Sequence, residues 1–296
     1  RPCGNHSVPV AGAVPPHHIY VRRNFVDRVQ PPSGTKTYLN YPVFSVLGVD
    51  TIVIEDNEVL SHRDTAKDRT LCAIASHPAS VHLAEKVDVS VINNQMLLAG
   101  GTGALPMILI SVVGNNTAVS LKAEINVSGN ELSLNNSSQD SGVYTAVSGP
   151  VPDGAANMTL KGNTYRAPGG TGKRAFSVGS GVNLRAMQNE VHNVTETFPF
   201  GVAGPGSGGA WVIDGNVFYN CACAATPGAV NSVVVSNNKM FGGMGGATSE
   251  PVQKGFSLPT RSSLFGNTFV SPVATPTVLI NGVATASTGI NYVVIP

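Results

Sequence analysis

Residues 125–132 read INVSGNEL, and the same frame returns as MTLKGNTY at residues 158–165 and as WVIDGNVF at residues 211–218. Each segment has two apolar residues two positions apart, then an asparagine three positions later, then an apolar residue two positions after the asparagine. The frame recurs, with one polar slip in the last copy, around nine asparagines that lie 22 to 37 residues apart: Asn24, Asn57, Asn94, Asn130, Asn163, Asn189, Asn216, Asn238 and Asn267. Self-similarity at such a period predicts a solenoid of stacked coils.

The apolar residues before each asparagine alternate with the period of a β-strand. The apolar residue after the asparagine breaks this alternation by one position, and a break in parity requires a bend. We place the asparagine at the bend, because asparagine tolerates the left-handed backbone region better than most residues with a side chain. The preceding residue is often glycine or asparagine, as at Gly129, Gly162 and Asn93, which suits a tight turn between two short strands.

Stacked coils would bring the nine asparagines into register, so that each amide bonds its neighbours on the coils above and below. An asparagine-rich antiparallel protein with ordinary hairpin turns is the alternative, but hairpins do not explain one frame at a nearly constant pitch. Over residues 19–270 the pattern resembles the right-handed parallel β-helix of the pectate-lyase-like superfamily, with its asparagine ladder. The resemblance implies an all-β solenoid of about nine or more coils.

That superfamily contains pectin and pectate lyases, polygalacturonases, alginate epimerases, autotransporter adhesins and phage tailspikes. The resemblance therefore implies a fold more than any one function. We expect three regions along the chain. Residues 1–16 are a Pro-rich lead-in to a truncated or processed N-terminus, and residues 17–270 form the β-helix. Residues 271–296 lose the frame and are expected to form a C-terminal cap or an oligomerisation segment, since an uncovered solenoid end exposes strand edges.

Composition excludes several classes of protein. The 296 residues are 42% hydrophobic and 12% charged, with a formal net charge of +1, which argues against a nucleic-acid binder with a basic face. The longest apolar run, residues 105–113, is too short for insertion across a bilayer. Four cysteines do not make a disulfide framework at this length, and the histidines show no metal-ligand spacing. We expect no metal and no other cofactor.

The register of the coils predicts which outward side chains lie on neighbouring coils, about 4.8 Å apart. Arg166, His192 and Tyr219 each lie three positions after a frame asparagine, so they should stack, with Glu190 on the same strand as His192. Lys161 and Asp214, two positions before their asparagines, also point outward. An ordinary solvated face with polar ladders is the alternative to a site here.

This cluster has the chemistry of a sugar-binding surface. An aromatic face can pack on a pyranose, while arginine and carboxylate groups bond hydroxyls or an acidic substituent. A glycosidase needs two carboxyl groups about 5–10 Å apart, and Glu131 and Glu190 lie two coils, or about 10 Å, apart. A lyase or epimerase needs a base and a cation, which His192 or Tyr219 could provide with Arg166.

We therefore predict that any catalysis involves Glu131, Glu190 and His192, and that Arg166, Tyr219, Asp214 and Lys161 bind substrate. Three functions fit these expectations. The first is a phage tailspike or fibre, a homotrimer in the virion, that recognises and could cleave a bacterial surface polysaccharide. The second is a stand-alone polysaccharide lyase, hydrolase or epimerase that is secreted. The third is a non-catalytic adhesin at the cell surface.

Overall fold

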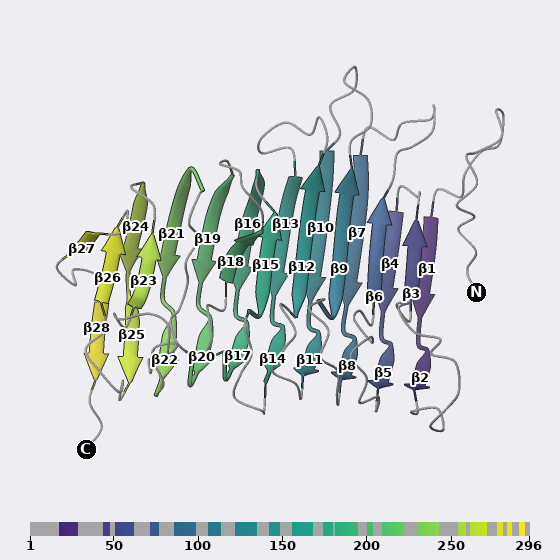
Figure 1. Ribbon diagram of the computed structural model, residues 1–296, viewed down its shortest axis with the longest axis horizontal. Coiled ribbons are helices and arrows are strands. Elements are labelled where there is room, and N and C mark those ends of the chain that lie inside the picture. Colours follow the sequence, from purple (N-terminus) through teal and green to yellow (C-terminus); the bar gives the residue numbers. More distant parts are fainter. Residues whose placement is uncertain are drawn as a thin grey trace, which may run out of the picture.

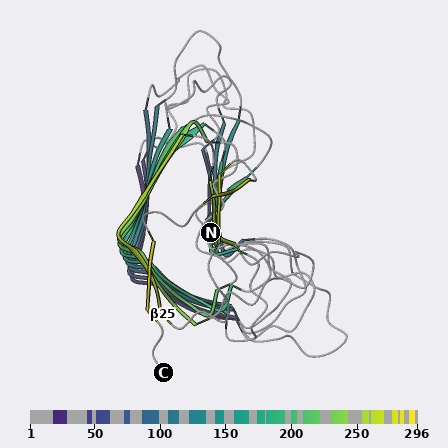
Figure 2. The same ribbon diagram turned by 90° about the vertical axis from the view of Figure 1, so that its left-hand side faces the viewer.

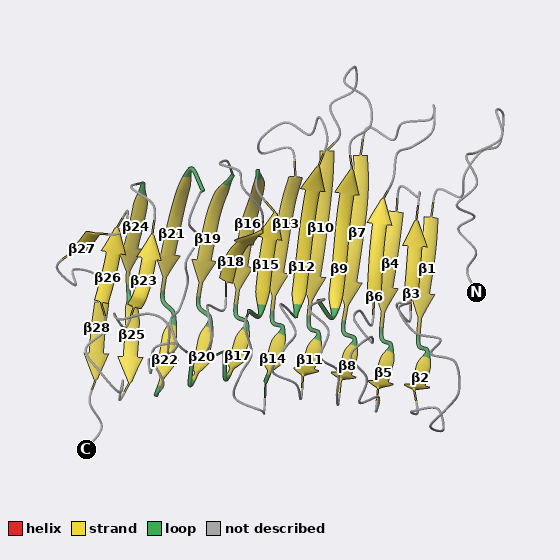
Figure 3. Cartoon of the chain, in the orientation of Figure 1, coloured by secondary structure: helices red, strands yellow, loops and turns green. Residues whose placement is uncertain are grey.

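The computed structural model contains only strands, turns and bends in the part of the chain that it describes (Figure 3). That part contains no helix long and apolar enough to cross a membrane. The described residues are 18–28, 44–47, 51–61, 72–76, 86–98, 106–113, 122–134, 142–148, 156–167, 174–179, 181–194, 200–203, 209–221, 230–242, 254–258, 261–270, 277–280, 283–285 and 290–293.

Three long sheets run side by side along one axis, and all their strand pairs are parallel (Figure 1). The first sheet consists of β1 (His18–Arg22), β4 (Thr51–Glu55), β7 (Lys86–Ile92), β10 (Lys122–Ser128), β13 (Ala156–Lys161), β16 (Val182–Met187), β19 (Ala210–Asp214), β21 (Ser232–Ser236) and β24 (Ser262–Phe265). The second consists of β2 (Phe25–Arg28), β5 (Glu58–Ser61), β8 (Gln95–Leu98), β11 (Glu131–Leu134), β14 (Thr164–Arg166), β17 (Glu190–His192), β20 (Val217–Tyr219), β22 (Lys239–Phe241), β25 (Asn267–Val270) and β28 (Ile290–Val293). The third consists of β3 (Phe44–Leu47), β6 (Cys72–Ser76), β9 (Ile108–Val113), β12 (Val143–Ser148), β15 (Phe176–Gly179) and β18 (Phe200–Ala203).

The three sheets are the walls of a right-handed parallel β-helix, which confirms the predicted fold class. Figure 2, turned by 90°, shows the strands of each sheet lying behind one another around a common interior. Each coil contributes one strand to a sheet, so neighbours in the sheet are about 30 residues apart in sequence. The number of coils stays a prediction.

The core follows from the alternation that the sequence shows. In β10 the inward residues Ala123, Ile125 and Val127 are buried, while the residues between them face outward. Because neighbouring strands pair in register, each inward residue stacks on its counterpart from the next coil, as Ile125 does on Met158. The largest fully buried side chains include Trp211 and Tyr165, and they belong to one continuous apolar cluster.

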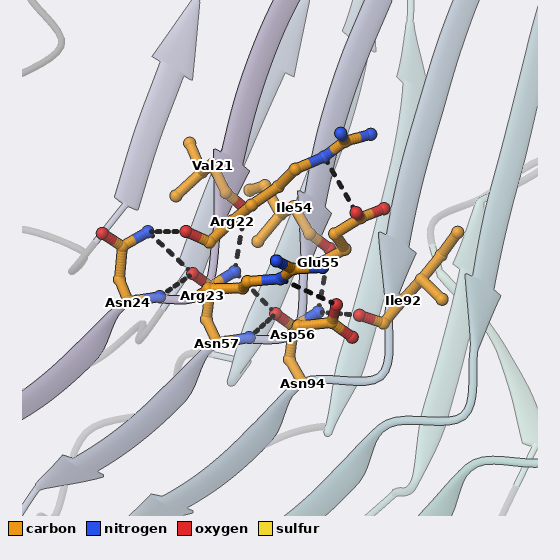
Figure 4. A network of polar contacts seen from close by, with 10 residues as sticks. All are labelled: Val21, Arg22, Arg23, Asn24, Ile54, Glu55, Asp56, Asn57, Ile92 and Asn94. Atoms are coloured by element: carbon orange, nitrogen blue, oxygen red, sulfur yellow. Dashed lines mark hydrogen bonds and ion pairs between the residues drawn. The ribbon is translucent and has the colours of Figure 1, made fainter.

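The predicted asparagine ladder is present and complete through all nine frame positions. At each step the backbone N–H and the Nδ2 of one asparagine both donate to the Oδ1 of the next, at 2.8–3.1 Å. Each Nδ2 from Asn57 onward also donates to a carbonyl of the preceding coil, as Asn57 does to Val21 (Figure 4). The buried amides are thereby satisfied along the whole interior of the bend.

The bend corrects one detail of the prediction. The left-handed residue is the one before each ladder asparagine, whereas none of the nine asparagines has a positive φ. These preceding residues have φ between 53° and 65°: Arg23, Asp56, Asn93, Gly129, Gly162, Gln188, Gly215, Asn237 and Gly266. The ladder asparagine points its side-chain amide into the coil, so the left-handed backbone conformation falls on the residue before it. Glycine is common at that preceding position, because it adopts a positive φ without steric cost.

The C-terminal strands continue the coil at one end. β28 pairs in parallel with β25, which extends the second sheet by one strand. β23 (Lys254–Leu258), β26 (Thr277–Ile280) and β27 (Val283–Thr285) form a small separate sheet, with β26 and β27 antiparallel. The role of residues 271–296 as a cap or oligomerisation segment stays a prediction, and the lead-in of residues 1–16 lies outside the described residues.

Candidate functional site

Four of the seven predicted site residues come together on the outer face of the second sheet. Arg166 on β14 pairs with His192 on β17, and His192 pairs with Tyr219 on β20, as the asparagine register predicts. Glu190 lies two residues before His192 on the same strand. Phe241 on β22 continues the row, because it pairs with Tyr219. We call Arg166, Glu190, His192, Tyr219 and Phe241 the outer strip.

The charged end of the outer strip is a three-membered contact. Arg166 Nη2 donates to Glu190 Oε1 at 3.4 Å, and Arg166 Nη1 lies 3.0 Å from His192 Nε2. His192 Nε2 is also 2.5 Å from Glu190 Oε1. The side chains of Arg166 and Glu190 are 44% and 39% exposed, whereas that of His192 is 19% exposed. The arginine and the carboxylate are thus open to solvent, and the imidazole is held between them and its aromatic neighbour.

The aromatic end is a stack of rings along the coil axis. The His192 and Tyr219 rings have centroids 4.6 Å apart and planes 11° apart. The Tyr219 and Phe241 rings follow at 5.2 Å and 15°. Tyr219 therefore has a ring on each face, and the stack offers its edges to solvent. This corrects the expectation that the Tyr219 face packs on a pyranose, because the register that aligns the rings also covers their faces.

Glu131 is not brought to the outer strip. It pairs with Thr164, which in turn pairs with Glu190, so two strand spacings separate the two glutamates. Its carboxylate accepts a hydrogen bond from Gln95 Nε2 at 3.2 Å, on the neighbouring strand away from Glu190. Two strand spacings amount to about 10 Å, the separation that the register predicts, and a catalytic role for Glu131 with Glu190 stays a prediction.

Lys161 and Asp214 also stand apart from the outer strip. Both lie before the bend, at the ends of β13 and β19 in the first sheet. Asp214 Oδ1 accepts hydrogen bonds from Ser236 Oγ at 2.6 Å and from Asn237 Nδ2 at 2.9 Å, so it belongs to a small polar cluster of the bend. Lys161 pairs in register with Ser128 and Met187.

The thiol of Cys221 lies inside the coil, behind the strand that carries Tyr219. Cys221 is fully buried, and its Sγ lies 3.5 Å from the carbonyl oxygen of Tyr219 and 3.6 Å from that of Val191. Burial raises the pKa of the Cys221 thiol to about 12. The thiolate is the nucleophilic form of cysteine, so this residue is inert at neutral pH and has a packing role.

Sequence reasoning missed two features of the outer face. Asn193 and Asn220 both have positive φ and are linked by a hydrogen bond from Asn220 Nδ2 to Asn193 Oδ1 at 3.0 Å. They form a short second ladder just after the outer strip, which a comparison of positions four residues after each frame asparagine could have found. Near the N-terminal end of the described coil, the Arg22 guanidinium lies 4.6 Å from the Tyr20 ring centroid and pairs with Glu55 at 2.8 Å.

No group of three or more metal-ligating side chains is assembled within the described ranges. Comparison of the chain with protein-family models, curated proteins and solved structures finds no match.

Proposed function

We propose that this chain is a tailspike-like β-helix protein that recognises a bacterial surface polysaccharide along the outer strip. The observation that carries the proposal is the row Arg166–His192–Tyr219–Phe241 on consecutive strands, with Glu190 beside it. The row joins a cation, a carboxylate, an imidazole and a phenol on one partly exposed line. Sugars are recognised by such groups, because hydroxyls both donate and accept hydrogen bonds.

The shape of the coil supports an extended ligand. The strands of the second sheet repeat about every 4.8 Å, so the outer strip offers polar groups at a regular spacing along the axis. Since the ring faces are covered by one another, recognition rests on hydrogen bonds from Arg166 and the Tyr219 hydroxyl, with ring edges as apolar contacts. A polymer with a repeating unit can use several such contacts at once, which increases its avidity.

The test is the binding of purified bacterial capsular and lipopolysaccharide fragments to the wild type and to Tyr219→Ala, measured by calorimetry. We expect the substitution to weaken binding at least tenfold. The matched control is Gln95→Ala, an exposed position on the same sheet three strands from β17, which should bind as the wild type does. Equal binding by Tyr219→Ala and the wild type would remove the outer strip from the proposal.

The tailspike assignment makes a separate statement about assembly and location. It implies a homotrimer in the virion, which light scattering on the purified chain measures directly. A trimeric mass supports the assignment. A clean monomer favours the secreted-enzyme or adhesin alternatives instead, while polysaccharide recognition by the outer strip would stand.

One contact favours depolymerisation as a second candidate function. Glu190 bonds His192 Nε2, an arrangement that fixes the orientation of the imidazole. Within the described residues both polar contacts of this ring are made by Nε2, so Nδ1 is the nitrogen that could accept a proton from a sugar carbon. Elimination would move the proton from the sugar carbon to Nδ1, form a carbon–carbon double bond and break the bond to the glycosidic oxygen on the neighbouring carbon, which leaves and takes up a proton. The product is an unsaturated sugar with a new ultraviolet absorbance. Its absence with every acidic polysaccharide that binds would reduce the function to recognition.

A further inference from the structure

Two nitrogen donors converge on one oxygen atom in the outer strip. Glu190 Oε1 lies 2.5 Å from His192 Nε2 and 3.4 Å from Arg166 Nη2. If Nε2 carried no proton, its lone pair would face a carboxylate oxygen, which is repulsive. Nε2 also lies 3.0 Å from Arg166 Nη1, which can only donate, but its shorter contact is the one with the carboxylate. We therefore place the proton on Nε2, so that the imidazole and Arg166 Nη2 both present N–H groups to Glu190 Oε1. Such a pair of donors is a binding position for an oxyanion.

Glu190 occupies this position without being fixed there. Its side chain is 39% exposed, it has three rotatable bonds, and its contact with Arg166 is long for a charge-assisted hydrogen bond. An exposed ion pair of this kind contributes little to stability. A ligand anion can therefore replace the Glu190 carboxylate at small cost.

The surroundings favour an anion over a cation. Ser133 pairs with Arg166 on one side, and Tyr219 pairs with His192 on the other, so neither position directly beside the two donors is charged. Without the Glu190 carboxylate, the two donors would face solvent as an uncompensated positive site.

We propose that Arg166 and His192 form a subsite for an anionic group of the glycan, and that Glu190 closes this subsite from within when no ligand is bound. The inference rests on the proposed function and names its ligand chemistry: a sugar bearing a carboxylate, sulfate or phosphate. Binding of the ligand moves the Glu190 side chain into solvent. No covalent step is involved.

The subsite makes an unusual prediction, because removing a charged residue of the outer strip should improve binding. Glu190→Gln keeps the size of the side chain and removes the competing charge. We expect Glu190→Gln to bind a uronate-containing oligosaccharide at least tenfold more tightly than the wild type. Arg166→Ala should lose at least tenfold, and Gln95→Ala should change nothing. Glu190→Ala provides a second variant in which the competing group is absent altogether.

The decisive experiment compares one acidic capsular oligosaccharide with the same oligosaccharide after reduction of its carboxyl groups, titrated into each variant. The subsite is supported if only the acidic form binds Glu190→Gln more tightly than the wild type. It is overturned if both forms bind alike to every variant, an outcome that leaves polysaccharide recognition intact. If neither form of the oligosaccharide binds the wild type, the proposed function is overturned instead.

A glycan-free arm tests the subsite alone. Inorganic phosphate and sulfate are titrated into Glu190→Gln while the His192 ring resonances are followed by NMR. Saturable shifts that are absent from Arg166→Ala identify a general oxyanion site. Shifts that occur only with the oligosaccharide show that the glycan must supply the anion. No shift with any of these probes contradicts the subsite.

Discussion

The nine ladder asparagines and the five residues of the outer strip are aligned by the same stacking of coils, yet they face opposite sides of the bend region. The ladder repeats one residue type, is buried from Asn57 onward and uses its amides to bond the coils together. The outer strip changes residue at every coil, is partly exposed and makes few bonds. Repetition inside the coil therefore provides stability, whereas variation outside it provides chemistry.

The difference lies in what each position can tolerate. An interior rung has neighbours above, below and on the backbone, so a change there leaves several buried groups without partners. An outer residue has water as an alternative partner.

The largest effect is expected from Asn163→Ala, in the middle of the ladder. The substitution removes two bonds donated by Nδ2, to Val127 O and Asn189 Oδ1, and two accepted by Oδ1 from Asn130. Several buried polar groups would be left unpaired, so we expect a loss of about 4 kcal/mol in the free energy of unfolding. Urea denaturation measures it.

The control for that substitution is Asn24→Ala, at the exposed end of the same ladder. Asn24 Nδ2 donates only to Asn57 Oδ1 and Arg22 O, and its carbonyl end bonds no described residue. A loss of about 1 kcal/mol or less is expected. Equal losses at the two positions would mean that burial of the rungs does not determine their contribution.

The next effect concerns the left-handed residues that join the two sides of the bend. Gly129 and Gly162 have φ of 64° and 62°, so alanine at either position carries the same backbone strain, about 1 kcal/mol. A Cβ at Gly129 would collide with Asn93 Oδ1, whereas one at Gly162 would meet no described atom within 4 Å. We expect Gly129→Ala to cost about 2–3 kcal/mol and Gly162→Ala about 1 kcal/mol in unfolding experiments. Identical costs would contradict the close approach.

A third prediction concerns pH and the interior side of the outer strip. The pKa of Cys221 is raised by burial, so the unfolded chain loses the thiol proton at a lower pH than the native chain. Stability from this group is therefore complete below the ordinary thiol pKa and declines as the pH rises toward about 12, by about 1.4 kcal/mol per pH unit.

Burial also raises the pKa of Tyr165, and its contribution has the same sign. The measurement is the free energy of unfolding between neutral and alkaline pH for the wild type and Cys221→Ala. We expect the curve of the variant to be flatter above the ordinary thiol pKa. Parallel curves would show that the thiol is not protected by burial.

The smallest effect on stability is expected in the outer strip itself. Tyr219→Ala removes an outward ring that stacks between His192 and Phe241. The stacking of partly exposed rings contributes about 0.5–1.5 kcal/mol, so the unfolding free energy should change by about 1 kcal/mol. Binding of polysaccharide should fall at least tenfold in the same variant. A large loss of stability would instead show that the outer strip is needed to stabilise the fold.

Much of the fold was predictable because one residue type marks one position in every coil. The spacing of Asn163, Asn189 and Asn216 fixes the register of the second sheet, and this register correctly placed Arg166 beside His192 and His192 beside Tyr219. The third sheet could not be aligned in this way. Its strands follow connections of different length, so no recurring residue type in the sequence marks that Ile108 pairs with both Cys72 and Val143.

The candidate site was predictable only as far as backbone register determines it. Register cannot tell which way a long side chain turns, and Glu131 turns toward Gln95 instead of toward Glu190. It also cannot tell whether an aligned aromatic ring offers a face or an edge, which depends on the ring of the next coil. These choices depend on side-chain contacts across strands, which a single sequence does not state.

The central claim is that polysaccharide binds along the outer strip and nowhere else on the described surface. Hydroxyl-radical footprinting with and without a bound oligosaccharide tests it directly, because aromatic and imidazole side chains report their own exposure. We predict protection of His192 and Tyr219, with Tyr20 and Phe25, which are 54% and 63% exposed, reacting as in the free protein. Protection at Tyr20 with none at Tyr219 would contradict the claim and move the site to the N-terminal end of the coil.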